Sequence, residues 1–77
     1  MPRPARKPAL DPHLKAIGQR IRQLRESRKI SQDMFADLAG IDRSYMSGIE
    51  RGVRNFGILH LFIIAKTLKV KPQDLLG

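Results

Sequence analysis

The strongest constraint on the fold is a pattern in the middle of the chain that predicts two short helices joined by a tight turn. Ser31 and Asp42 each stand where a helix can begin, because their side-chain oxygens can accept a hydrogen bond from an unpaired backbone N–H of the first turn. Gly40 lies between them and can adopt the left-handed conformation that ends a helix. Apolar residues follow both caps at helical spacing. The sequence therefore predicts helices over residues 32–39 and 43–51.

The second of these helices has one apolar face and one polar face. Met46, Ile49 and the stem of Tyr45 are expected to point toward a core. The opposite face, which we expect to be exposed to solvent, carries Arg43, Ser44, Ser47 and Gly48. A short polar helix that follows a tight turn fits the major groove of double-stranded DNA.

Composition favours an anionic partner. The 77 residues allow one domain, and the formal net charge of +8 favours an anionic polymer or surface, although a merely soluble basic domain would have the same charge. The chain has no cysteine, which excludes disulfides and cysteine-ligated zinc. No apolar run approaches the roughly 18 residues that span a bilayer. These features predict a cytoplasmic, nucleoid-associated protein with no membrane partner.

The chain divides into an arm and a domain. Residues 1–11 hold three prolines and three basic residues with little that could pack, which predicts a disordered basic arm. Two interpretations of this arm stay open: a solvated tail, or a segment that lies along phosphates or enters a minor groove of DNA. Residues 12–77 are expected to form the helix-turn-helix domain.

The domain is expected to be all-α, with five helices and no strand. Its first helix starts at Asp11-Pro12, a capping residue followed by a proline in the first helical position, and ends near Arg28 or Lys29. The fourth helix spans about 58–68. A last short helix opens at Pro72 and reaches Leu76.

Several groups of residues occur in the order that is typical of one known family. These groups are Ser31-Gln32, Ala36, Ala39-Gly40-Ile41, Ile49-Glu50-Arg51-Gly52 and Ile64-Ala65. With them, the segment from Ile17 to Leu76 resembles the lambda-repressor-like, Cro-type helix-turn-helix family. More narrowly, Asp42 to Asn55 resembles the controller proteins of restriction-modification systems. The resemblance implies a compact five-helix DNA-binding domain with its helix-turn-helix at helices two and three.

Four consecutive or nearby side chains are candidates for contact with DNA. The guanidinium of Arg43 can pair with O6 and N7 of guanine, for about 1–3 kcal/mol of discrimination, and the resemblance implies that this position touches bases. Ser44 and Ser47 could each bond a base edge or a phosphate, or could serve only as small residues that let the helix approach. For Tyr45 two interpretations stay open: a hydroxyl that bonds a phosphate, or plain core packing.

The remaining DNA candidates depend more on the resemblance. Glycine inside a helix costs up to about 1 kcal/mol relative to alanine, and many relatives carry a long base-reading side chain at the position of Gly48. We therefore expect Gly48 to permit close approach to the groove. The resemblance also implies that Gln32 sets its side chain and a backbone N–H against a phosphate. Arg54 and Asn55 resemble positions that hold the DNA backbone or reach base edges.

The resemblance also implies a structural ion pair. The family pairs the glutamate at the position of Glu50 with the arginine at the position of Arg25. We expect a partly buried Arg25–Glu50 pair that holds the third helix at its angle. The alternative is two unrelated surface charges.

The fourth helix holds more apolar residues than one buried stripe needs. Ile58, Leu61, Ile64, Ala65 and Leu68 would suffice for the core. Leu59, Phe62 and Ile63 are left over, and many relatives have polar residues there. An apolar outward face favours a partner, so we expect a homodimer interface. The alternative is that the basic arm or the C-terminus covers this face.

The sequence contains no catalytic constellation, no cofactor motif and no cluster of metal ligands. The function that fits is a sequence-specific, double-stranded DNA-binding regulator of transcription that acts as a homodimer on a pseudo-palindromic operator, such as a restriction-modification controller. RNA polymerase is a further candidate partner. The alternatives are a protein-interaction adaptor or antitoxin-type module on the same fold, and a non-specific architectural DNA-binding protein.

Overall fold

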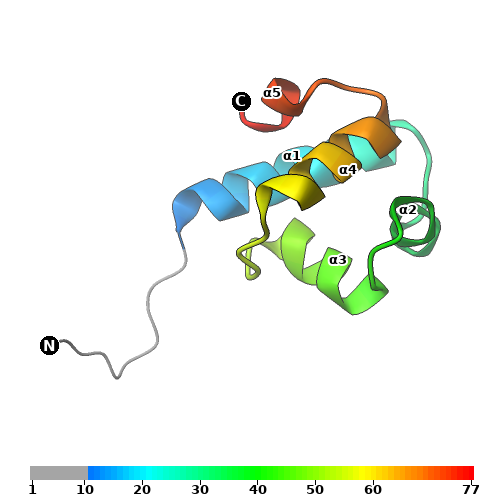
Figure 1. The fold of residues 1–77 in the computed structure, drawn as a ribbon, viewed down its shortest axis with the longest axis horizontal. Helices are drawn as coiled ribbons and strands as arrows, with labels where there is room; N and C mark the ends of the chain where they lie inside the picture. The colour runs from blue at the N-terminus through cyan, green and yellow to red at the C-terminus, as the bar shows by residue number, and fades with distance from the viewer. Residues whose placement is uncertain (1–10) are drawn as a thin grey trace, which may run out of the picture.

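The computed structural model describes residues 11–77, and over that range it consists of five α-helices and no strand (Figure 1). The helices are α1 (Pro12–Ser27), α2 (Gln32–Ala39), α3 (Arg43–Arg51), α4 (Ile58–Leu68) and α5 (Pro72–Leu75). The all-α prediction and the order of the helices are confirmed. None of these helices is long and apolar enough to cross a membrane.

The predicted helix bounds agree closely with the structure. Those of α2, α3 and α4 are the same, whereas α1 ends at Ser27, just before the expected Arg28 or Lys29, and α5 ends at Leu75 rather than Leu76. The arm was expected over residues 1–11, of which residues 1–10 lie outside the described residues. Its last residue, Asp11, is the N-cap of α1.

Side-chain caps fix where the first three helices begin. Asp11 accepts a hydrogen bond from the His13 backbone N–H at 2.8 Å, Ser31 caps α2 at 3.1 Å, and Asp42 caps α3 at 3.2 Å. The hydrogen bonds from His13 hold the pKa of Asp11 below its usual value, so this cap keeps its charge to a lower pH than an ordinary aspartate. Gly40 ends α2 with φ +68°, in the left-handed region that favours glycine.

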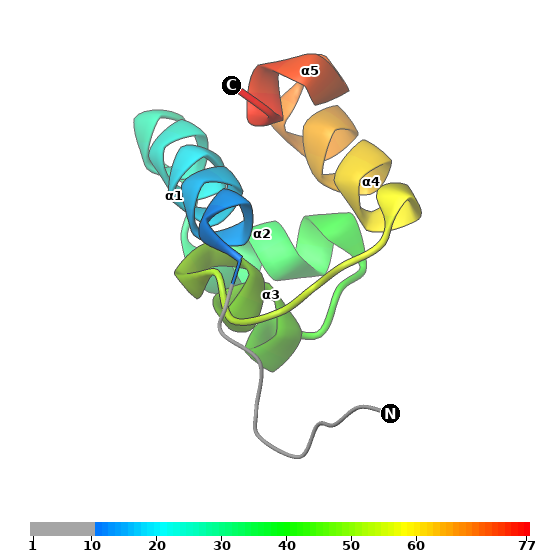
Figure 2. The ribbon, with the colours of Figure 1, turned by 90° about the vertical axis from the view of Figure 1, so that its left-hand side faces the viewer.

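The helices enclose one core. Its fully buried large side chains are Ile21, Phe35, Met46, Ile49, Ile64, Leu68 and Leu75. Helix α1 packs mainly on α3, α4 packs on α2, and α5 covers α1 and α4. Both ribbon views place α3 at the end of the domain opposite α5 (Figures 1 and 2). Helix α3 therefore presents its outer face at one end of the molecule.

One predicted core position is wrong. Ile58 was expected in the inward stripe of α4, but its side chain is 62% exposed. Ile58 is the first residue of α4, at the edge of the core, and it lines an open apolar groove together with Leu14, Leu61 and Leu76. Ile58 has the predicted helical spacing, but the first turn of α4 extends beyond the buried core.

Candidate nucleic-acid interface

The outer face of α3 and the start of α2 together line a shallow polar groove. Its volume is about 260 Å³, and its lining residues are Gln32, Arg43, Ser44, Ser47 and Arg51. Helix α3 begins directly after the tight turn, so its first residues project at the rim of this groove. Ser44 is exposed and Ser47 is half-buried. The structure thus brings four of the predicted DNA-contacting residues to one surface.

Arg43 points to solvent and is paired with Asp33. Its side chain is 65% exposed, and its Nε lies 2.8 Å from Oδ1 of Asp33, whose side chain is 72% exposed. Asp33 lies in the first turn of α2. The pair connects the starts of two consecutive helices. Because both side chains are solvated, it contributes little to stability, and its main effect is to orient the guanidinium.

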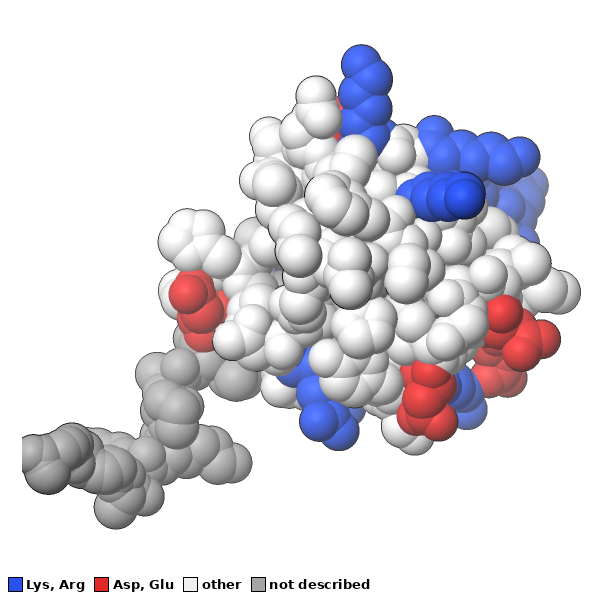
Figure 3. All heavy atoms as spheres, in the orientation of Figure 1, with Lys and Arg blue, Asp and Glu red and all other residues white. Residues whose placement is uncertain are grey.

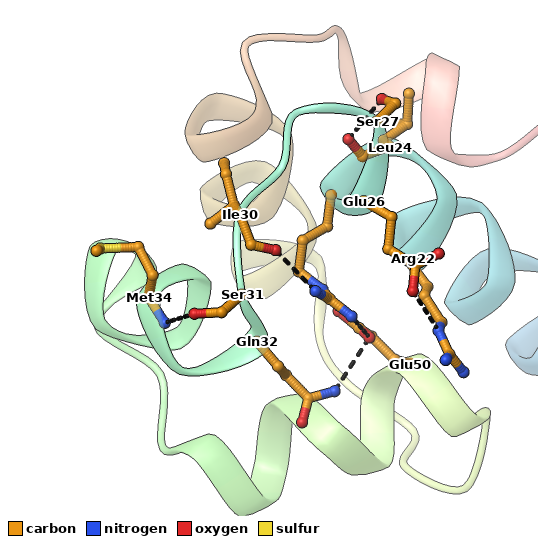
Figure 4. Close-up of polar contacts among 10 residues, drawn as sticks. Arg22, Leu24, Glu26, Ser27, Ile30, Ser31, Gln32, Met34 and Glu50 are labelled. Atoms are coloured by element: carbon orange, nitrogen blue, oxygen red, sulfur yellow. Dashed lines mark hydrogen bonds and ion pairs between the residues drawn. The ribbon is translucent and has the colours of Figure 1, made fainter.

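A buried ion pair connects α1 to α3. Nε and Nη2 of Arg25 donate to the two carboxylate oxygens of Glu50 at 2.7 and 3.0 Å, in the paired geometry that gives the strongest ionic hydrogen bonds (Figure 4). The side chains are only 9% and 2% exposed. The hydrogen bond to Glu50 raises the pKa of Arg25 above its ordinary value.

Two further hydrogen bonds complete this buried network. Nη1 of Arg25 donates to the carbonyl oxygen of Ile30 at 2.8 Å, and Nε2 of Gln32 donates to Oε1 of Glu50 at 3.0 Å (Figure 4). One amide N–H of Gln32 therefore satisfies a buried carboxylate, where an unpaired acceptor would be costly. A contact between Gln32 and a phosphate stays a prediction. Gln32 still borders the polar groove.

Gly48 does not lie on the solvent face of α3, contrary to expectation. The residue is buried, and a Cβ built on it would lie 2.5 Å from Cγ of Arg54. The loop after α3 folds back so that the stem of Arg54 covers this glycine. Gly48 is thus covered, and the exposed side chain of Arg54 lies over it.

Tyr45 is half-buried and packs against two side chains from beyond α3. Its ring centroid lies 5.2 Å from that of His60 at an interplanar angle of 44°, and 5.2 Å from the guanidinium carbon of Arg54. Of the two interpretations of Tyr45, packing is the one for which contacts are seen. His60 was not indicated by the sequence as part of this surface. Arg54 and Asn55 are both exposed, just beyond the C-terminal end of α3.

A second surface lies on α4. Leu59, Phe62 and Ile63 are 72%, 49% and 40% exposed, and Ile58 extends the same apolar set. In the orientation of Figure 1, where α4 lies in front, the central part of this face carries no acidic or basic side chain (Figure 3). A contiguous, uncharged apolar face of this kind is typical of a protein interface.

Comparison with known proteins agrees with this geometry. A family model described as helix-turn-helix matches residues 21–75. The chain belongs to the helix-turn-helix family. It is 43% identical over 61 residues to the control protein C.BamHI of Bacillus amyloliquefaciens, a match that covers 78% of this chain and 75% of that protein.

Solved structures show the same relationship. The fold is similar to that of the restriction-modification controller protein C.AhdI from Aeromonas hydrophila, with a TM-score of 0.79 and 42% identity over 80% of this chain and 94% of that one. It is also similar to SinR, a master regulator for biofilm formation that was crystallised in complex with DNA. That match has a TM-score of 0.76 and 39% identity over 79% of this chain and 98% of the crystallised chain.

Within residues 11–77 no three histidine, cysteine or acidic side chains gather where they could hold a metal ion. The polar groups of the candidate surface are guanidinium, hydroxyl and amide groups. Such groups suit hydrogen bonding to bases and phosphates.

The buried network predicts a large cost for removing its acid. We expect Glu50→Ala to lower the free energy of unfolding by about 3–5 kcal/mol, because it leaves the Arg25 charge buried and unpaired. Urea unfolding followed by circular dichroism measures this loss. Glu26→Ala is the matched control, since Glu26 pairs with Arg22 at 3.1 Å with both side chains more than half exposed, and its loss should stay below about 1 kcal/mol. Equal losses in the two variants would disprove the structural importance of the buried pair.

Proposed function

We propose that this protein is a sequence-specific, double-stranded DNA-binding regulator of transcription, and that it serves as a restriction-modification controller or a similar autoregulator. The observation that supports this most directly is the outer face of α3, where Arg43 is exposed at the rim of a polar groove. The relatives C.BamHI and C.AhdI are control proteins, and SinR was crystallised with DNA. The protein acts by binding, and not as an enzyme.

Helix α3 would enter the major groove with its first turn against the base edges. The guanidinium of Arg43 can donate two parallel hydrogen bonds to a guanine, and Ser44 follows it at the exposed surface. Because the Arg43–Asp33 pair is solvated, exchanging the carboxylate for a guanine costs little. Arg51 and Asn55 are exposed at the other end of α3, and the exposed side chain of Arg54 extends along the helix to Tyr45. These groups suit phosphate contacts, which supply salt-dependent affinity.

The protein would bind its operator as a homodimer formed through Leu59, Phe62 and Ile63 of α4. Burying these side chains against their copies removes apolar surface from water. In such a dimer two α3 helices would enter successive major grooves about 34–36 Å apart, which gives a pseudo-palindromic operator.

The alternative functions have less support. An adaptor or antitoxin-type module on this fold would not need exposed arginines along α3, and a purely architectural DNA-binding protein would not need Arg43 beside small hydroxyl side chains at the rim of a polar groove. We further propose that the regulator contacts RNA polymerase through the outer face of α2. There the exposed acids Asp33 and Asp37 accompany the exposed apolar residues Met34 and Leu38. Its place of action would be the cytoplasm, at the nucleoid.

Truncation of Arg43 tests the proposed reading of DNA. Footprinting across the DNA upstream of the protein's own gene should first show protection that specific competitor removes better than random DNA. We expect Arg43→Ala to lose about 1–3 kcal/mol of binding to the protected duplex, roughly 5- to 150-fold, and to lose preference at one guanine.

The control is Arg20→Ala, which removes the same charge from α1, where Arg20 Nε donates to the Asp74 carbonyl oxygen of α5. This variant should keep the preference of the wild-type protein. An Arg43→Ala variant with unchanged preference between specific and random duplexes rejects the assignment of Arg43 to base reading.

A lysine on the apolar face of α4 tests the proposed dimer. Ile63→Lys should give a monomer by light scattering and weaken operator binding, because a charge cannot be buried unpaired between two copies. Val53→Lys is the matched control, since Val53 is also 40% exposed but lies in the loop after α3. It should leave the oligomeric state unchanged. A dimer that survives Ile63→Lys rejects this interface.

A further inference from the structure

Gly48 occupies a position in α3 where glycine is unfavourable, and the structure shows what occupies the space that it leaves. Glycine is the poorest helix former after proline. A Cβ at this position would lie 2.5 Å from Cγ, 3.4 Å from Nε and 3.5 Å from Cδ of Arg54. The stem of Arg54 therefore lies directly on the backbone of α3. Any other residue at position 48 would have a Cβ that overlaps this stem.

The head of Arg54 is held as well. Its guanidinium carbon lies 5.2 Å from the ring centroid of Tyr45, within the range of a cation–π interaction. The Tyr45 ring is in turn packed against His60. The loop that carries Arg54 is fixed by a hydrogen bond of 2.9 Å from the Val53 N–H to the Gly48 carbonyl oxygen. Arg54 nevertheless remains exposed to solvent.

We propose that Gly48 and Tyr45 are positioning residues, which hold the side chain of Arg54 in one conformation and so order its guanidinium in the free protein. This inference rests on the proposed DNA-binding function. A long, free side chain loses rotamer entropy when it is immobilised on a ligand, and a side chain that is already ordered avoids most of that loss. Glycine at position 48 thus leaves room for a cationic side chain from the following loop to lie on the side of α3. A longer residue at this position would place its own side chain there.

The experiment replaces Gly48 by alanine, alone and together with Arg54→Ala. The nearest atom that the new Cβ would meet is Cγ of Arg54, so the whole side chain of Arg54 has to take another rotamer. We expect Gly48→Ala to melt at or above the temperature of the wild-type protein, because alanine is the best helix former. Tyr45 is the only tyrosine and there is no tryptophan, so tyrosine fluorescence and ring proton shifts report whether the guanidinium has left the ring.

Binding is measured with a duplex selected by the wild-type protein from a random library. We expect Gly48→Ala and Arg54→Ala each to weaken binding about 2- to 10-fold, in the range of one lost ordered side chain. The double variant should bind no more weakly than Arg54→Ala alone. Arg51→Ala, which removes another exposed arginine, is the control background. In it, Gly48→Ala should weaken DNA binding by the same factor as in the wild-type protein.

Two results overturn the inference alone. One is unchanged binding by Gly48→Ala although the tyrosine signals show that Arg54 has moved. The other is an equal loss from Gly48→Ala with and without Arg54, which would mean that the glycine itself must approach the DNA. A wild-type protein that selects no duplex overturns the proposed function, and this inference with it.

Discussion

The arrangement of the helix-turn-helix depends on one buried ion pair. Arg25 of α1 and Glu50 of α3 lose most of their hydration in the fold, and such a pair is tolerated only when nearly every hydrogen-bonding group is satisfied. Here the carbonyl oxygen of Ile30 and the amide of Gln32 complete the set. The network therefore joins α1, the loop before α2, α2 itself and α3. A displacement of α3 that breaks these hydrogen bonds would leave buried charges unpaired, and this cost favours one orientation of the outer face of α3.

Much of the fold could be predicted because its signals are local. Ser31 and Gly40 decide where α2 begins and ends, and Asp42 decides where α3 begins. They act through hydrogen bonds and backbone conformations within a few residues, so the sequence alone shows them. The pairing of Arg25 with Glu50 spans 25 positions and has no local signal. It could be anticipated only because the family resemblance supplied it.

What could not be predicted arises where distant segments meet. Helical periodicity places Gly48 on the polar face of α3, but it contains nothing about a loop that folds back to cover that face with Arg54. The same limit explains why Gln32 turns inward to Glu50 and why His60 joins Tyr45. Gly18 is another such position: a Cβ there would overlap the carbonyl oxygens of Ile49 and Glu50, so this glycine allows α1 to lie directly against α3. In the sequence, the only sign of this close packing is a glycine in the interior of a helix.

The central claim is that α3 is held as part of the rigid core and is not ordered by DNA. Native-state hydrogen exchange of the free protein tests this claim most directly, because it gives the opening free energy of each helix separately. We predict that amide protons in the second half of α3 exchange only through global unfolding, with the same free energy as the most protected amides of α1 and α4. Amides of α3 that exchange through a local opening, while α1 and α4 stay protected, would contradict the claim.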